Sequence, residues 1–338
     1  MNLIKAAATP AASRFGPDAL ILDAEAEIER ICEWLRQTVG RDLRKRGAVL
    51  GLSGGIDSSV TAALCARALG PSKTVGIFMP EQDSDPDSLR LGRALAERLQ
   101  IETVLEDIAP SLSAAGCYRR RDDFIRQIVP DFAEGWGCKV VLEDALAGRG
   151  YNISWLVVAD RQGEQSRHRM PLEVYLGMIA AANMKQRTRK QIEYYHADRL
   201  NYAVAGTPNR LEYDQGFFVK NGDGAADFKP IAHLYKSQVY QLAEALGVPE
   251  EICRRPPTTD TWSLPQGQDE YYFSLPYREM DLCLYALDHS VAAEEAAEAT
   301  GLTPAQVEAV WKNIHAKRKV AHYLHAAPAT LLQDQPTV

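Results

Sequence analysis

The amino-acid sequence predicts an α/β fold with a doubly wound parallel sheet and a helical carboxyl-terminal part. Strand-like apolar runs alternate with helix-like runs over the first third of the chain, in the order β-α-β-α-β. Such units build a parallel sheet with right-handed crossovers and helices on both faces. The last third carries apolar residues at helical spacing. In sheets of this kind, ligands bind beyond the carboxyl ends of the strands.

The first half of the chain supplies most of the predicted sheet. Residues 24–39 have apolar positions at helical spacing and are expected to cover one of its faces. Strands are expected at 48–52, 73–79 and 101–105, with helices between them at 60–69 and 87–99. The run 73–79 is continuous and β-rich, which is typical of a strand buried on both faces.

The second half adds one more buried strand and a set of helices. A helix is expected over about 176–200 and a strand over 202–207. The later helices are expected at 234–246, 277–289, 292–299 and 303–324. Residues 1–18 are expected to form a loosely ordered leader, 19–325 a single domain and 326–338 a tail. With 338 residues, 46% of them hydrophobic, the chain can bury a full core.

Composition narrows the classes of function. A net charge of -7 and a pI near 5.6 argue against a general affinity for nucleic acid or membranes, because such affinity needs a basic face. The six cysteines are scattered without paired spacing, which predicts neither a disulfide framework nor a zinc site. No apolar stretch is long enough to cross a bilayer, and the amino terminus lacks the plan of a signal peptide. We therefore expect a cytoplasmic protein.

The turn at residues 53–59, Ser-Gly-Gly-Ile-Asp-Ser-Ser, stands between the first strand and its helix. Its glycines let the backbone approach an oxyanion, its serines offer donors, and the next helix points its positive dipole end at the same place. It lacks the lysine of a Walker loop, so γ-phosphate transfer is not indicated. The string resembles the pyrophosphate loop of the N-type ATP pyrophosphatases, whose fold is adenine nucleotide α-hydrolase-like. In that superfamily ATP is split between its α- and β-phosphates.

A second group of motifs indicates the family. Residues 206–212 end a predicted strand, and the string 216–230 concentrates Gly, Asp and Lys. Together with 183–187, 234–236 and 257–260, these segments resemble, in order, the NAD synthetases. The resemblance covers roughly 20–110 and 180–325. It implies conversion of deamido-NAD to NAD. The nicotinate carboxylate attacks the α-phosphate of ATP and expels pyrophosphate, and ammonia then displaces AMP.

The resemblance also implies roles for individual residues. The ATP site would comprise Gly51, Leu52, Ser53, Gly54, Gly55, Ile56, Asp57, Ser58, Thr207, Lys236 and Thr258. The catalytic candidates among them are Asp57, Lys236 and Thr258. The metal would be Mg²⁺, held by Asp57 and Glu212, because this ion binds through one or two carboxylates and phosphate oxygens. The acceptor dinucleotide would contact Arg187, Lys220, Asp227 and Lys317.

Three departures from the family pattern stand out. An insert at about 111–172 makes the chain longer than the short ammonia-using members, and loops of such length are usually either functional or disordered. The family's His-Lys pair near the carboxyl end reads Ala316-Lys317 here. Residues 79–85 are acidic and lack the basic residue often seen after that strand. We expect the insert to cover the acceptor pocket or extend a dimer contact; the alternative is a surface excursion with a small core of its own.

The nitrogen source and the partners follow from the same resemblance. No stretch carries the Glu, Lys and Cys of the glutaminase fused to some relatives, so ammonia is expected from solution or from a separate glutaminase. A homodimer with acceptor sites at its interface is implied. Two alternatives stay open: an ATP-dependent amide ligase acting on a different carboxylic acid, and a non-catalytic nucleotide-binding protein. The second is weakened because a binder needs no apparatus to release pyrophosphate.

Overall fold

The computed structural model describes residues 15–142, 154–259 and 261–331, and its main sheet has four parallel strands in the order β3-β2-β1-β7. The strands are β1 (Ala48–Gly51), β2 (Thr74–Phe78), β3 (Glu102–Leu105) and β7 (Ala203–Val204). β2 and β3 extend the sheet on one side of β1, and β7 extends it on the other. This order confirms the doubly wound fold and opens a crevice at the carboxyl end of β1.

The last strand is shorter than the sequence predicts. Residues 202–207 read as one buried strand, but β7 pairs with β1 only through Ala203 and Val204. The amide of the next residue, Ala205, still donates to the carbonyl oxygen of Val49 in β1 at 2.9 Å, and Ala205 also forms a bridge with Phe228. The strand ends there, and Thr207 lies in a loop rather than in a strand.

Helices cover both faces of the sheet. Side chains alternate along β1, so Ala48 and Leu50 face one helical layer and Val49 faces the other. The first layer contains α1 (Ala24–Gln37), α2 (Ile56–Leu69), α3 (Pro86–Leu99) and α8 (Lys236–Ala245). The second contains α4 (Ala109–Ala114), α5 (Cys117–Arg126) and α6 (Leu172–Leu200). α6 begins earlier than predicted, and Pro171 occupies its N-cap position.

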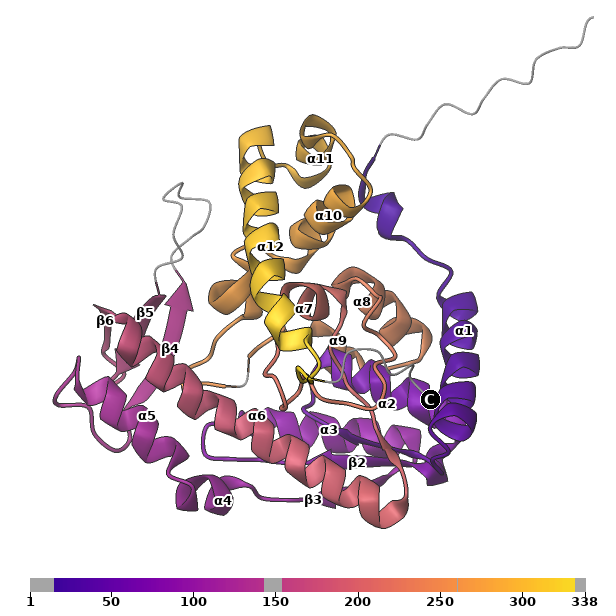
Figure 1. Cartoon of the computed structure of the whole chain (residues 1–338), viewed down its shortest axis with the longest axis horizontal. Helices are drawn as coiled ribbons and strands as arrows, with labels where there is room; N and C mark the ends of the chain where they lie inside the picture. The colour runs from indigo at the N-terminus through magenta and orange to yellow at the C-terminus, as the bar shows by residue number, and fades with distance from the viewer. Residues whose placement is uncertain (1–14, 143–153, 260, 332–338) are drawn as a thin grey trace, which may run out of the picture.

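The insert folds into a sheet of its own. Its strands β4 (Gly137–Leu142), β5 (Ser154–Ala159) and β6 (Gln165–Arg169) are antiparallel. They enclose a separate apolar cluster with α5 and the start of α6, which includes Ile125, Leu156 and Met178. Figure 1 shows this sheet at one end of α6, apart from the main sheet. The insert therefore packs a small core of its own, which was part of the alternative expectation of a surface excursion.

The last third is helical, as predicted. The predicted helices appear as α8, α10 (Tyr277–Asp288), α11 (Ala293–Thr300) and α12 (Pro304–His325). Two short helices were not predicted, α7 (Arg210–Gln215) and α9 (Glu250–Arg254). Of the predicted leader, the structure describes only the last residues, where Phe15 stacks on Tyr285 of α10 with 5.7 Å between ring centroids. Within the described ranges, no helix combines the length and apolar character that a bilayer span requires.

Candidate active site

The turn between β1 and α2 has the backbone shape that its glycines predict. Gly54 adopts a φ of +72°, and a Cβ there would lie 2.5 Å from the carbonyl oxygen of Ser88. Both constraints favour glycine. Gly55 follows as the N-cap of α2 in an extended conformation. The turn therefore presses against α3 and presents the amino terminus of α2 to the crevice.

Serine hydroxyls fasten this turn to the helix. The hydroxyls of Ser58 and Ser59 donate to the carbonyl oxygen of Gly55 at 3.1 and 2.8 Å. The hydroxyls of Ser53 and Ser58 are hydrogen-bonded to each other at 3.1 Å. Polar donors are thereby gathered at a helix amino terminus, where the macrodipole favours an anion.

Asp57, in the first turn of α2, meets side chains from two distant segments. Its Oδ2 pairs with Nζ of Lys236, the first residue of α8. Its Oδ1 accepts a hydrogen bond from Asn209 at 3.0 Å. Asn209 also caps α7 and forms a capping box with Glu212. The two carboxylates expected to bind metal are thus linked through Asn209 and lie beside one lysine.

Two carboxylates share a single lysine in this group, so its charges cannot balance while both carboxylates are ionised. Burial and the negative charge of Asp57 raise the pKa of Glu212 to about 8. Burial opposes the charged form of Lys236, but the two carboxylates beside it raise its pKa above the usual value. In the described ranges, no group of three or more His, Cys, Asp or Glu could hold a metal ion. A cation that stabilised the ionised form of Glu212 here would take its remaining ligands from a substrate.

Asp281 on α10 positions Lys236. Its carboxylate accepts hydrogen bonds from the amides of Lys236 and Ser237 at 3.1 and 2.7 Å, and from the Ser237 hydroxyl at 2.6 Å. Asp281 is fully buried, and burial raises its pKa to about 6. Because these bonds satisfy the first turn of α8, they fix the point from which the lysine side chain extends.

A cavity of about 930 Å³ connects these groups with the insert and α12. Residues three or four positions apart on α6 form one long wall: Leu172, Tyr175, Ile179, Ala182, Asn183, Gln186, Arg189, Lys190 and Glu193. The insert contributes Val140, Ser154, Arg169 and Met170. The volume lies at the upper end of the range of ordinary ligand pockets.

The structure brings together nearly all residues that the sequence assigns to ATP and metal. The lining includes Gly51, Leu52, Ser53, Gly55, Ile56, Asp57, Ser58, Thr207, Glu212, Lys236 and Thr258. Gly54 lies behind this lining and packs on Ser88. Gly51 also stands where space is short, because a Cβ there would lie 2.9 Å from Oε1 of Glu193.

Of the four residues assigned to the acceptor, one lines the cavity and three do not. Lys317 of α12 lines the cavity, and its ammonium donates to the carbonyl oxygen of Tyr272 at 2.6 Å. Burial lowers the pKa of Lys317 to about 7. Arg187, Lys220 and Asp227 are not among the lining residues.

Those three residues make contacts outside the cavity. Arg187 donates to the carbonyl oxygen of Lys220 at 3.2 Å, and the Lys220 ammonium donates to the carbonyl oxygen of Tyr323 at 2.8 Å. Asp227 accepts a hydrogen bond from the amide of Val204 at 2.7 Å. Their assignment to the acceptor stays a prediction.

Several residues that line the cavity were not assigned a role from the sequence. Lys190 and Glu193 form a buried ion pair of 2.5 Å below Gly51. Arg255 reaches the Ser88 hydroxyl at 3.2 Å and pairs with Asp85 at 2.7 Å. The spacing of Lys190 and Glu193 on one face of the predicted helix could have identified them as residues that face the cavity. No local pattern in the sequence distinguishes Arg255 from a solvent-exposed arginine.

Known proteins of one family resemble this chain over most of its length. The NAD synthase family matches residues 27–128 and 157–323, with the interruption inside the insert. An NH(3)-dependent NAD(+) synthetase of Rhizobium rhizogenes (strain K84 / ATCC BAA-868) is 64% identical over 316 residues, which cover 94% of this chain and 95% of that protein. One from Thermotoga maritima is 35% identical over 261 residues, covering 77% and 86%.

Solved structures show the same fold at lower identity. An NMN synthetase from Francisella tularensis superposes with a TM-score of 0.63 at 23% identity, covering 92% of this chain and 99% of that one. An NH3-dependent NAD synthetase from Campylobacter jejuni superposes with a TM-score of 0.59 at 24% identity, covering 92% and 100%. Since the family match spans most of the sheet and the site, this chain belongs to the NAD synthase family.

Proposed function

We propose that this chain is an ammonia-dependent NAD synthetase, which uses ATP to convert deamido-NAD to NAD and releases AMP and pyrophosphate. The observation that carries the proposal is the cluster of Asp57, Glu212 and Lys236 beside the glycine turn, inside one cavity. Relatives at 64% identity that bear this name support it.

The reaction needs activation of the carboxylate and stabilisation of the negative charge that grows on phosphate, and the groups lining this cavity can supply both. A carboxylate is a poor electrophile, so its oxygen first attacks the α-phosphate, the bond to the β-phosphate breaks, and pyrophosphate leaves. Ammonia then attacks the carbonyl carbon of the adenylate, loses a proton and displaces AMP. We assign Lys236, Thr258 and the turn at Gly51–Ser58 to ATP and its leaving pyrophosphate, because negative charge grows there.

We also propose a Mg²⁺ site at Asp57 and Glu212. Two carboxylates beside a single lysine suit a divalent cation, because burial and the charge of Asp57 both raise the pKa of Glu212, and a cation would favour its ionised form. The ion would supply positive charge to the phosphate oxygens of ATP. Asn209 and Gln268 orient the carboxylates through hydrogen bonds of 3.0 Å each.

The acceptor would lie in the part of the cavity near Lys317. Because Arg187, Lys220 and Asp227 lie outside the lining of a single chain, we propose that they contact the acceptor across a homodimer. Exposed apolar side chains near the cavity mouth, Leu172, Leu176, Val320 and Tyr323, support such association. We further propose that residues 19–325 form one domain of a cytoplasmic enzyme, with a separate glutaminase as a possible ammonia source.

The direct test is an incubation of the purified protein with ATP, Mg²⁺, ammonium and deamido-NAD, followed by chromatography. We expect NAD, AMP and pyrophosphate in equal amounts, and no NAD when glutamine replaces ammonium. ATP consumption without an amide product would refute the assignment of the acceptor. Glutamine-driven turnover by homogeneous protein would refute ammonia dependence.

One alternative keeps the adenylating site but changes the acceptor. Ala316 replaces a family histidine beside Lys317, and the insert adds Arg169 to the cavity wall. Both changes lie where a carboxylic acid other than deamido-NAD would be selected. Nicotinate mononucleotide and free nicotinate therefore belong in the same assay, and a kcat/KM for either above that of deamido-NAD would favour this alternative.

A further inference from the structure

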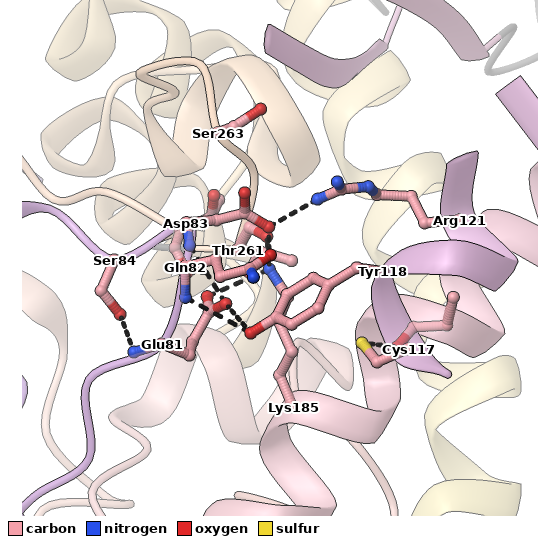
Figure 2. Close-up of polar contacts among 12 residues, drawn as sticks. Glu81, Gln82, Asp83, Ser84, Cys117, Tyr118, Arg121, Lys185, Thr261 and Ser263 are labelled. Carbon is pink, nitrogen blue, oxygen red and sulfur yellow. Dashed lines mark hydrogen bonds and ion pairs between the residues drawn. The ribbon is translucent and has the colours of Figure 1, made fainter. Parts of the chain in front are cut away.

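A buried charge network lies next to the cavity and joins four segments of the chain (Figure 2). At its centre, the ammonium of Lys185 on α6 lies 3.0 Å from Oε1 of Glu81 and 2.6 Å from Oδ2 of Asp83. It also donates to the carbonyl oxygen of Thr261 at 2.8 Å. Arg121, on the insert helix α5, lies 2.6 Å from the same oxygen of Asp83. The network therefore ties the acidic loop after β2 to the insert, to α6 and to the chain at Thr261.

The network is enclosed, and each of its carboxylates is paired with a cation. The side chains of Lys185 and Glu81 are 3% and 0% exposed, and that of Arg121 is 11% exposed. Lys185 pairs with Glu81 and Asp83, and Arg121 pairs with Asp83 and, at the rim, with Asp122 at 2.8 Å. The Tyr118 hydroxyl donates to Glu81 at 2.9 Å. Loss of one partner would leave an uncompensated buried charge, so the network favours one geometry.

The insert sheet also holds the residues that follow Thr258. We call residues 257–259 and 261–268 the threonine loop. The amide of Cys138 on β4 donates to the Ser263 hydroxyl at 2.8 Å, and the amide of Leu264 donates to the carbonyl oxygen of Cys138 at 3.2 Å. The side chain of Gln266 donates to the carbonyl oxygen of Val140. The threonine loop thus occupies the free edge of β4.

The far end of the threonine loop reaches the catalytic cluster. Trp262 is 4% exposed and packs in the insert core, which anchors the loop. Thr258 forms a bridge with Gly267, so the two arms of the loop are paired. The side chain of Gln268 donates to Oε1 of Glu212 at 3.0 Å. One contiguous path of contacts therefore leads from the insert to the carboxylate proposed to bind metal.

From this arrangement we infer that the insert is a scaffold that positions the threonine loop for the adenylation step, with Lys185 and Arg121 as positioning residues. Loops are the least stable parts of a fold unless packing orders them, and donors that act on a leaving phosphate must be held in place before the reaction. The inference rests on the proposed function for the identity of that step; the order of the loop can be measured without any substrate.

Three variants and a control test the inference. Arg121→Gln removes one cation of the network, Arg121→Lys keeps the charge, and Ser263→Ala removes the hydroxyl that Cys138 contacts. Arg119→Gln is the matched control, because Arg119 lies on the same helix, is exposed and pairs only with Asp123 at 3.5 Å among the described residues. Hydrogen exchange of the peptide 257–268 is measured without ligands, and kcat for adenylation and KM for ATP are measured well below the unfolding temperature.

We expect Arg121→Gln and Ser263→Ala to speed hydrogen exchange in the threonine loop about tenfold and to lower kcat for adenylation by a similar factor. Exchange in α2 should not change, and Arg121→Lys and Arg119→Gln should resemble the parent. A role limited to stability would lower the unfolding temperature without changing kcat. If hydrogen exchange in the threonine loop of Arg121→Gln and Ser263→Ala stayed at the parental rate, the inference would be overturned. Faster exchange together with the parental kcat would overturn it as well. Failure of the parent to use deamido-NAD would refute only the proposed function.

Discussion

The site at the glycine turn and the insert each bury a cluster of charges, but the carboxylates of the two clusters are paired differently. Near the glycine turn, Asp57 pairs with Lys236, whereas Glu212 has no ion pair among the described residues, and burial and the charge of Asp57 raise its pKa to about 8. At the insert, Glu81, Asp83 and Asp122 each lie within 3.0 Å of Lys185 or Arg121. A carboxylate without a cation favours a ligand that supplies one, whereas a fully paired cluster contributes a fixed geometry. The pairing of the carboxylates therefore distinguishes the proposed binding site from a structural contact.

The largest effect is expected at the two carboxylates that we propose bind Mg²⁺. Asp57→Asn or Glu212→Gln removes one of two like charges, so the fold should persist. Adenylation should fall about 10²-fold or more, about 3 kcal/mol in the barrier. The measurement is exchange of labelled pyrophosphate into ATP, with the exposed Glu97→Gln on α3 as control. Exchange at the parental rate in either variant would show that its carboxylate has another role.

The opposite result is expected at the insert cluster. Asp83→Asn leaves Lys185 paired with Glu81 and Arg121 paired with Asp122. The free energy of unfolding should drop by about 2–3 kcal/mol, because two buried cations each lose one of their two carboxylate partners. Urea unfolding measures this change. Asp87→Asn, at an exposed pair with Arg90, should cost less than about 0.5 kcal/mol. Equal losses in the two variants would remove the distinction between the clusters.

Two glycines, one in the turn after β1 and one in the insert, allow the two regions to be compared at the level of the backbone. Gly54 and Gly163 both have positive φ, but only Gly54 faces a neighbour, the carbonyl oxygen of Ser88. Gly163→Ala, in the insert hairpin, should cost about 1 kcal/mol from strain alone. Gly54→Ala should cost about 2 kcal/mol and weaken ATP binding, since the turn must also move. Calorimetric unfolding and ATP titration would test both; similar stabilities in the two variants would contradict the close approach.

The smallest expected effect concerns pH and the acceptor. Burial holds the pKa of Lys317 at about 7 in the free protein, and an anionic acceptor beside it would raise that pKa. Binding should therefore take up a proton, and affinity should fall as pH rises from about 7 to 9. We expect KM for the acceptor to rise about tenfold over this range, against little change in Lys317→Met. Lys319→Met, exposed on the same helix, should keep the parental profile.

Much of the nucleotide core was predictable because its signals are local. A buried strand, two glycines and a helix start lie within about a dozen residues, and their spacing alone predicts an anion site after β1. The helical last third follows from its period in the same way. The predicted end of β7 and the predicted start of α6 differ from the observed ones by a few residues. β7 ends where Ala205 forms a bridge with the distant Phe228, and α6 starts after Pro171, which occupies its N-cap position.

The roles within the site depended on resemblance and on packing. Lys236 is 179 residues from Asp57 in the chain, and no local pattern distinguishes it from a solvated helix lysine. Its position depends on Asp281, which caps α8 from another helix. Asn209 had a readable signal, because Asn209-x-x-Glu212 has the spacing of a capping box.

The sequence by itself determined which segments form strands, helices and an anion-binding turn, because neighbours within a few residues decide backbone shape. Only the tertiary structure decided which charges share a site and which balance one another. The acidic run 79–85 could be read as a missing cation near ATP, yet Lys185 and Arg121 arrive from α6 and the insert to pair with it. The energy of a buried charge depends on partners far away in the chain, and those partners meet only when the core has packed.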